Sequence, residues 1–260
     1  MAFKARSASR FAASVLFLSE ILYKKKPDDI MAKTKVTSQE SFTNKEDPTR
    51  RIPNMKLIDQ TVTAFTEQLA SPAPVPGGGG ASALAAAIGI SLGDMVGELT
   101  VGKKRYADVE EDIRSLMERA QALRLRFLEL VDADAEAFAP LAKAYGIPKD
   151  DPGRAQVMEN ALKVACSVPM DIMRACGEAI DIIEEFAAKG SRLAISDAGC
   201  GAILCKAAMQ AASLNVYINT KSMKDRACAQ ALEDEADALL AKYTLLGDSV
   251  YNSVVNKLRG

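Results

Sequence analysis

The residue types of this chain limit its acid–base chemistry before any fold is considered. None of the 260 residues is a histidine, so the usual general base and the commonest metal ligand are both missing. The five cysteines are scattered and form no C-x-x-C pair, the usual start of a zinc site. We therefore expect no metal and no cofactor, buried free thiols in a reducing cytoplasm, and catalysis by carboxylates, lysines, tyrosines or cysteines.

One carboxylate, Asp134, interrupts an apolar stripe. Steps of three and four residues place these positions on one helix face: Val109, Ile113, Leu116, Ala120, Leu123, Phe127, Leu130, Asp134, Phe138 and Leu141. A carboxylate on such a face is either paired with a cation or desolvated, and desolvation raises its pKa. Asp134 is therefore a candidate general acid/base, with a buried structural hydrogen bond as the alternative. Its neighbours Asp132 and Glu136 point elsewhere, so we expect them to be solvated.

Four glycines, Gly77, Gly78, Gly79 and Gly80, follow two prolines and lead into an alanine-rich helix. Backbone N–H groups at such a helix start are open to a ligand and lie at the positive end of the helix dipole. A dinucleotide-binding loop would need a strand immediately before it, whereas residues 68–74 are typical of a helix end and a proline-rich loop. The run is either a ligand-binding backbone loop or a plain helix–helix connector.

A basic cluster follows the same helix. Residues 97–103 match the phosphate-loop pattern G-x-x-x-x-G-K, but Lys104 stands where magnesium binding needs Ser or Thr, and no strand precedes. We therefore exclude a nucleotide site. Lys103 and Lys104 either stabilise the helix C-terminus or hold an anionic ligand.

Two further polar groups lie in apolar surroundings. Ser196 and Asp197 precede an apolar helix, where both residue types are favoured as caps, so capping alone would explain them. Asn215 and Asn219 are one helical turn apart with Tyr217 between them, and asparagines in an apolar segment need hydrogen-bond partners.

Helical periodicity is the only sustained pattern after Met55. The predicted helices cover residues 57–69, 81–104, 108–145, 151–189, 196 onward and 224–258, with the fourth broken or kinked at Pro169. We therefore predict an all-α, up-and-down helical bundle. Long helices with a wide apolar face commonly pair across subunits, which favours a homodimer.

The first 54 residues differ from the rest in composition. They hold 11 Lys/Arg against 6 Asp/Glu, a net charge of +5, within a net charge of −1 for the whole chain. We interpret residues 1–54 as a disordered or mis-annotated extension and residues 55–260 as the functional domain. The overall charge gives no reason to expect nucleic acid. The longest apolar run, residues 81–92, stops at Asp94, so we expect no membrane span.

Five motifs together indicate a family. They are PVPGGGG at 74–80, GKKRY at 102–106, DAEAF at 134–138, ISDAG at 195–199 and LNVYIN at 214–219. In order and spacing, from about Met55 to Lys257, they resemble the cyclodeaminase/cyclohydrolase family of folate enzymes. The chain departs from the usual family pattern at Cys200-Gly201, where Val-Ala is common.

The resemblance implies an all-helical dimer that binds a folate substrate in a groove between helices. It implies that Asp134 is catalytic. It also implies substrate contacts by a set that matches the motifs: Gly77, Gly78, Gly79, Gly80, Lys103, Lys104, Tyr106, Ser196, Asp197 and Asn215.

Two activities share this scaffold, and neither needs a metal. A cyclohydrolase adds water to 5,10-methenyltetrahydrofolate and yields 10-formyltetrahydrofolate, whereas a cyclodeaminase closes the ring of 5-formiminotetrahydrofolate and expels ammonia. We favour the cyclohydrolase, because the motif residues are more similar to those of stand-alone bacterial enzymes and no transferase half precedes the domain. In that reaction Asp134 would take a proton from water and could return it to N5. A helical scaffold that binds folate without catalysis is the alternative of another class, and Asp134 argues against it.

Overall fold

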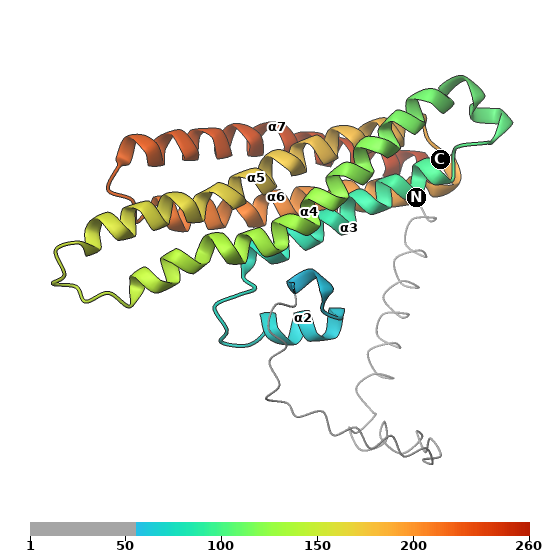
Figure 1. Cartoon of the computed structure of the whole chain (residues 1–260). Helices are drawn as coiled ribbons and strands as arrows, with labels where there is room; N and C mark the ends of the chain where they lie inside the picture. The colour runs from blue at the N-terminus through green and yellow to red at the C-terminus, as the bar shows by residue number, and fades with distance from the viewer. Residues whose placement is uncertain (1–55) are drawn as a thin grey trace, which may run out of the picture. The chain divides into compact units, whose positions relative to one another are not determined.

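The computed structural model describes residues 56–260, and within that range the chain is helical and contains no strand (Figure 1). Five long helices run side by side, preceded by one short helix. The elements are η3 (Leu57–Asp59), α2 (Val62–Leu69), α3 (Gly78–Glu98), η4 (Lys104–Val109), α4 (Glu110–Tyr145), α5 (Arg154–Lys189), η5 (Arg192–Ala194), α6 (Ile195–Thr220) and α7 (Arg226–Arg259). Short connections between α4, α5, α6 and α7 make an up-and-down bundle, as predicted. The extension assigned to residues 1–54 lies outside the described residues.

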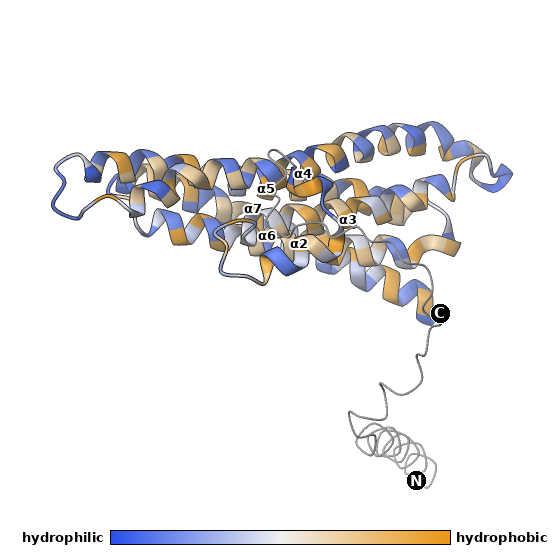
Figure 2. Cartoon of the chain, turned by 60° about the horizontal axis from the view of Figure 1, so that its bottom comes forward, coloured by the Kyte–Doolittle hydropathy of each residue, from blue (hydrophilic) through white to orange (hydrophobic). Residues whose placement is uncertain are grey.

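Helix α3 packs against α4, α5 and α6, and glycines allow the close approach. A Cβ atom on Gly89 would lie 2.6 Å from Cys205 Sγ, and one on Gly201 would lie 2.6 Å from the Gly89 carbonyl oxygen. Only glycine fits at these two positions. The side chains that face inward are apolar and the outward ones mostly polar, so both kinds alternate along each helix in Figure 2.

The expectation about apolar length was wrong for α3. Within residues 56–260, α3 is the one helix that is long and apolar enough to cross a membrane by length and composition. Met95 and Val96 extend the apolar stretch beyond Leu92, and the single charge of Asp94 does not offset them. Since 56% of the apolar window is buried among other helices, the composition is also that of a core helix.

Helix α5 is not broken at Pro169, so of the two predicted alternatives, a break or a kink, the break was wrong. A proline lacks the N–H that would bond to the carbonyl four residues earlier, which here belongs to Ala165. That carbonyl instead accepts a hydrogen bond from Asn219 Nδ2 of α6, 3.3 Å away. The buried Asn219 thus finds the partner that its apolar surroundings demand, and α5 continues through the proline.

Other corrections concern helix ends and cysteines. The first α-helix starts at Val62 rather than Leu57, because the Thr61 hydroxyl caps it by accepting from the Ala64 N–H at 3.1 Å. The glycine run is the first turn of α3 rather than a loop before it, and α3 ends at Glu98 rather than near Lys104. The cysteines are all free, but not all are buried: Cys166, Cys176 and Cys205 are buried, Cys228 is half-buried and Cys200 is exposed.

Candidate functional site

The N-terminal end of α3 brings together three of the predicted site features. We call this region, made of Gly77–Gly80, Asp134 and Asn215, the glycine end. The Gly80 N–H donates to Asp134 Oδ2 at 2.9 Å. A Cβ atom on Gly79 would lie 2.1 Å from Asp134 Oδ1, so the carboxylate occupies the space that a side chain would need. A Cβ atom on Gly78 would lie 3.1 Å from Asn215 Nδ2.

The surroundings of Asp134 suit a proton acceptor. The side chain is half-buried, and burial raises its pKa, while the hydrogen bond from the Gly80 N–H opposes that rise. Of the two alternatives set by the sequence, desolvation therefore holds, and a backbone N–H at a helix N-terminus takes the place of a cation. Oδ2 carries the structural bond, which leaves Oδ1 for chemistry.

The expectation that Asp132 is solvated was wrong, although Glu136 is exposed as expected. Asp132 is half-buried, and its Oδ1 accepts a hydrogen bond from the Leu57 N–H at 2.6 Å. Since Asp132 and Asp134 hold Leu57 and Gly80, one turn of α4 fixes both ends of the segment between them. No local pattern signals the Leu57 contact, because the two partners are 75 residues apart.

The C-terminal end of α3 holds the remaining predicted residues. We call this region, made of Lys103–Tyr106, Ser191–Arg192 and Ser196–Asp197, the lysine end. Lys103 Nζ donates to the Leu99 carbonyl oxygen, so this lysine does stabilise the helix C-terminus. Lys104 is exposed in the first turn of η4.

Two consecutive N–H groups of the connection between α5 and α6 are also held at this end. That of Ser191 donates to Thr100 Oγ1 at 2.7 Å, and that of Arg192 donates to the Tyr106 hydroxyl at 3.1 Å. Thr100, a buried threonine, was missed by sequence reasoning.

Tyr106 is electrostatically tuned. The hydrogen bond from the Arg192 N–H lowers its pKa most, burial opposes this, and the Ser191 hydroxyl and the charges of Arg105 and Lys103 lower it further. The Arg105 guanidinium lies 5.8 Å from the centroid of the ring. The lysine end therefore contains a phenol that loses its proton more readily than a free tyrosine does.

The capping interpretation of Ser196 and Asp197 was wrong. Ala194 is the N-cap of α6, and no side chain caps this helix. Ser196 and Asp197 instead lie in the first helical turn, the serine exposed and the aspartate half-buried. Both side chains thus remain candidates for ligand contacts.

The two ends are far apart in one chain. Eighteen residues separate Gly80 from Glu98 on α3, a distance of about 27 Å at 1.5 Å per residue. Asn215 and Ser196 are separated by a similar length of α6. A single chain therefore does not assemble all of the predicted residues into one site.

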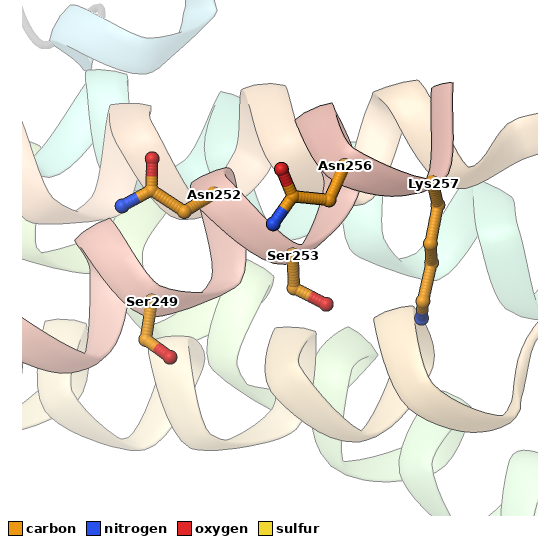
Figure 3. A pocket seen from close by; sticks show the side chains of 5 residues that line it. All are labelled: Ser249, Asn252, Ser253, Asn256 and Lys257. Carbon is orange, nitrogen blue, oxygen red and sulfur yellow. The ribbon is translucent and has the colours of Figure 1, made fainter. Parts of the chain in front are cut away.

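A polar concavity on α7 is a weaker candidate. Its lining comes from one helix: Ser249, Asn252, Ser253, Asn256 and Lys257. Figure 3 shows the two asparagine amides pointing away from the Lys257 side chain. Lys257 Nζ already donates to the Ala187 carbonyl oxygen at 3.0 Å. These groups do not converge on a common point, so the glycine and lysine ends remain the better candidates.

The chain is similar to folate enzymes of known activity and to one solved structure. The methenyltetrahydrofolate cyclohydrolase of Methylorubrum extorquens is 40% identical over 204 residues, which cover 77% of this chain and 98% of that protein. The formimidoyltransferase-cyclodeaminase of Mus musculus is 29% identical over 192 residues, and the chain covers only 36% of that longer protein. The solved structure of formiminotetrahydrofolate cyclodeaminase from Thermotoga maritima superposes with a TM-score of 0.67 at 32% identity, covering 77% of this chain and 96% of that one.

A family model confirms the resemblance inferred from the five motifs. The model for formiminotransferase-cyclodeaminase matches residues 61–238, a range that includes every predicted site residue. This match and the 40% identity across a nearly full-length relative lead to one conclusion. The chain belongs to the formiminotransferase-cyclodeaminase family.

Proposed function

We propose that this protein hydrolyses 5,10-methenyltetrahydrofolate to 10-formyltetrahydrofolate. The observation that carries the proposal is the half-buried Asp134 carboxylate, held by the Gly80 N–H at the start of α3. The 40% identity to a methenyltetrahydrofolate cyclohydrolase supports the choice of reaction. The chain needs no metal or cofactor for it, acts in the cytoplasm, and has neither nucleic acid nor a membrane as partner. The lack of histidine supports the first of these statements.

The reaction needs a base for water and a site for a cation. The methenyl carbon lies between N5 and N10 in a positively charged amidinium group, so water attacks it once a base takes a proton. Asp134 Oδ1 is suited to this, because Oδ2 is already held by the Gly80 N–H and fixes the plane of the carboxylate. The negative charge of Asp134 also stabilises the cationic substrate beside it.

The site is completed by a second copy of the chain. Asp134 and Tyr106 lie at opposite ends of α3, and a folate cannot bring its one-carbon unit to both ends of a helix about 31 Å long. In a homodimer with a two-fold axis near the middle of α3, the glycine end of each copy meets the lysine end of the other. All five family motifs then contribute to each of two sites.

An exposed apolar face supports this dimer. It runs along neighbouring helices α3 and α6, and its exposed apolar side chains are Ile88, Met95, Leu99, Ile203, Leu214 and Ile218. Two helices side by side, each about 30 Å long and about 10 Å wide, offer on the order of 600 Å². That approaches the roughly 800 Å² per partner of a stable interface.

The second candidate is the cyclodeaminase reaction, which the Thermotoga maritima and Mus musculus relatives favour. One assay separates the two. Purified protein is given 5,10-methenyltetrahydrofolate and, separately, 5-formiminotetrahydrofolate, and we measure loss of methenyl absorbance and release of ammonia. We expect turnover of the first substrate above its spontaneous hydrolysis. Ammonia release without methenyl hydrolysis would support the cyclodeaminase. The absence of both activities would support a non-catalytic scaffold.

A further inference from the structure

Tyr106 is held in an unusual and well-defined position. Its backbone (φ −114°, ψ 15°) departs from helical values within η4 and lies in the sparsely populated bridge region. Its hydroxyl oxygen accepts the Arg192 N–H at 3.1 Å. Since that bond uses a lone pair of the oxygen, the hydroxyl proton is left to be donated elsewhere.

The groups around Tyr106 favour loss of that proton. The charged groups acting on it are Arg105 and Lys103 of the same segment, both cationic, and the Arg192 N–H and Ser191 hydroxyl come from the neighbouring connection. All of them stabilise a phenolate, and Arg105 lies over the ring at 5.8 Å. These neighbours make Tyr106 a better proton donor than a free tyrosine.

We propose that Tyr106 of one copy donates the proton that N5 needs as the folate ring opens, while Asp134 of the second copy serves the attacking water. The proposal rests on the proposed hydrolysis and on the two-copy site. It divides the proton transfers between two groups, because Asp134 Oδ2 is held by the Gly80 N–H and only Oδ1 is left to take a proton from the water.

The transfers balance. Water forms a bond to the methenyl carbon and gives one proton to Asp134, which leaves a neutral carbinol. The bond from that carbon to N5 then breaks, N5 keeps the electron pair and takes the Tyr106 proton, and the carbinol oxygen forms the formyl C=O. The proton of the carbinol oxygen passes to the Tyr106 phenolate, and Asp134 releases its proton to solvent. One proton is released in total, as hydrolysis of the cation requires.

The first test replaces Tyr106 by phenylalanine. We expect kcat to fall by about 10²–10⁴, the usual range for a positioned acid–base group, with KM changed by less than a few-fold. The control is Tyr145→Phe, an exposed tyrosine at the far end of α4, which should leave both constants unchanged. A Tyr106→Phe variant within a few-fold of wild-type kcat would overturn the proposal and leave the proposed function standing, because wild-type turnover is measured in the same assay.

A second measurement separates proton donation from simple capping of the Arg192 N–H. A fluorinated tyrosine installed at position 106 keeps the hydroxyl and lowers its pKa. If the phenol donates the proton, the basic limb of the kcat–pH profile moves to lower pH. If Tyr106 only holds the turn, the limb stays in place, and the proposal fails.

The third measurement asks whether Tyr106 and Asp134 of different copies share one site. Tyr106→Phe and Asp134→Asn chains are unfolded together, refolded and assayed. Random pairing makes half of the dimers mixed, and each mixed dimer has one site with no substitution, so about a quarter of wild-type activity should return. Recovery well below this, with both parent variants inactive and mixed dimers present by mass, would overturn the sharing.

Discussion

The glycine end and the lysine end of α3 are built by opposite means. At the glycine end, backbone and carboxylate touch so closely that a single methyl group on Gly79 would collide with Asp134. At the lysine end, Lys103, Lys104 and Arg105 are exposed, and single hydrogen bonds join neighbouring segments. Changes at the glycine end should therefore act on the chemical step. Changes among the exposed charges of the lysine end should act weakly and mainly on binding.

The largest effect should come from Asp134→Asn, which keeps the shape of the side chain but cannot accept a proton. We expect kcat to fall by about 10²–10⁴ with folate affinity largely retained, and the acidic limb of the pH–rate profile to disappear. Steady-state kinetics and equilibrium binding of the substrate check both parts. Turnover within a few-fold of wild type would make Asp134 a structural residue.

Dissociating the dimer, which separates the glycine end of one copy from the lysine end of the other, should lower activity almost as much. Ile203→Glu places a charge on the apolar face of α6, where the side chain is 39% exposed, and we expect monomers with at least a tenfold loss of activity at micromolar concentration. The matched control is Val164→Glu, since Val164 is 45% exposed on α5, away from that face. Sedimentation velocity and activity are measured on both. A dimeric, active Ile203→Glu variant would contradict the shared site.

Activity should also be sensitive to a single methyl group at the glycine end. In Gly79→Ala the new Cβ must displace the whole Asp134 carboxylate, and a shift of about 1 Å in a catalytic group can cost about 10²-fold in rate. Gly146→Ala at the end of α4 is the control, because a Cβ there meets only the Lys143 carbonyl oxygen at 3.4 Å and its φ of −77° suits alanine. Helical circular dichroism should not change in either variant. Equal kcat values for both would return the glycine run to a connector.

Asp134 should lower the free energy of unfolding in the pH range where its carboxylate is ionised. Burial raises its pKa in the folded protein, so the folded state holds this proton more tightly than the unfolded chain does. The free energy of unfolding then falls as pH rises from the unfolded pKa through the folded one. Asp134→Asn removes this loss, so it should raise Tm at pH 7 and lose the advantage at acid pH. A lower Tm at pH 7 would indicate a structural role for the carboxylate.

The sequence was informative where a feature is local. The apolar stripe on α4 is buried as its spacing predicts, and Asp134 lies in it with a raised pKa. The predicted break at Pro169 and the predicted solvation of Asp132 were wrong for one shared reason. The carbonyl left free by Pro169 and the Asp132 carboxylate bond to Asn219 and to the Leu57 N–H, which lie 54 and 75 residues away in the sequence. The separation of the two ends was in principle predictable from the length of α3, but the motif order alone did not reveal it.

The smallest effect should come from Lys104, and it would sharpen the contrast between the two ends. Lys103 already donates to the Leu99 carbonyl oxygen, so Lys104 is the freer of the two to meet the carboxylates of a folate tail. Exposed ion pairs are weak, so Lys104→Ala should raise KM for polyglutamylated substrate by about fivefold or less, with a smaller effect on the monoglutamate and with kcat unchanged. The difference should shrink as salt is added, because exposed charges are screened.

The control is Lys149→Ala. Lys149 is an exposed lysine between α4 and α5, and its replacement should leave KM unchanged. Equal effects on both substrates would mean that Lys104 contributes to stability or acts elsewhere, and a loss in kcat would mean that Lys104 takes part in the chemistry assigned to Asp134 and Tyr106.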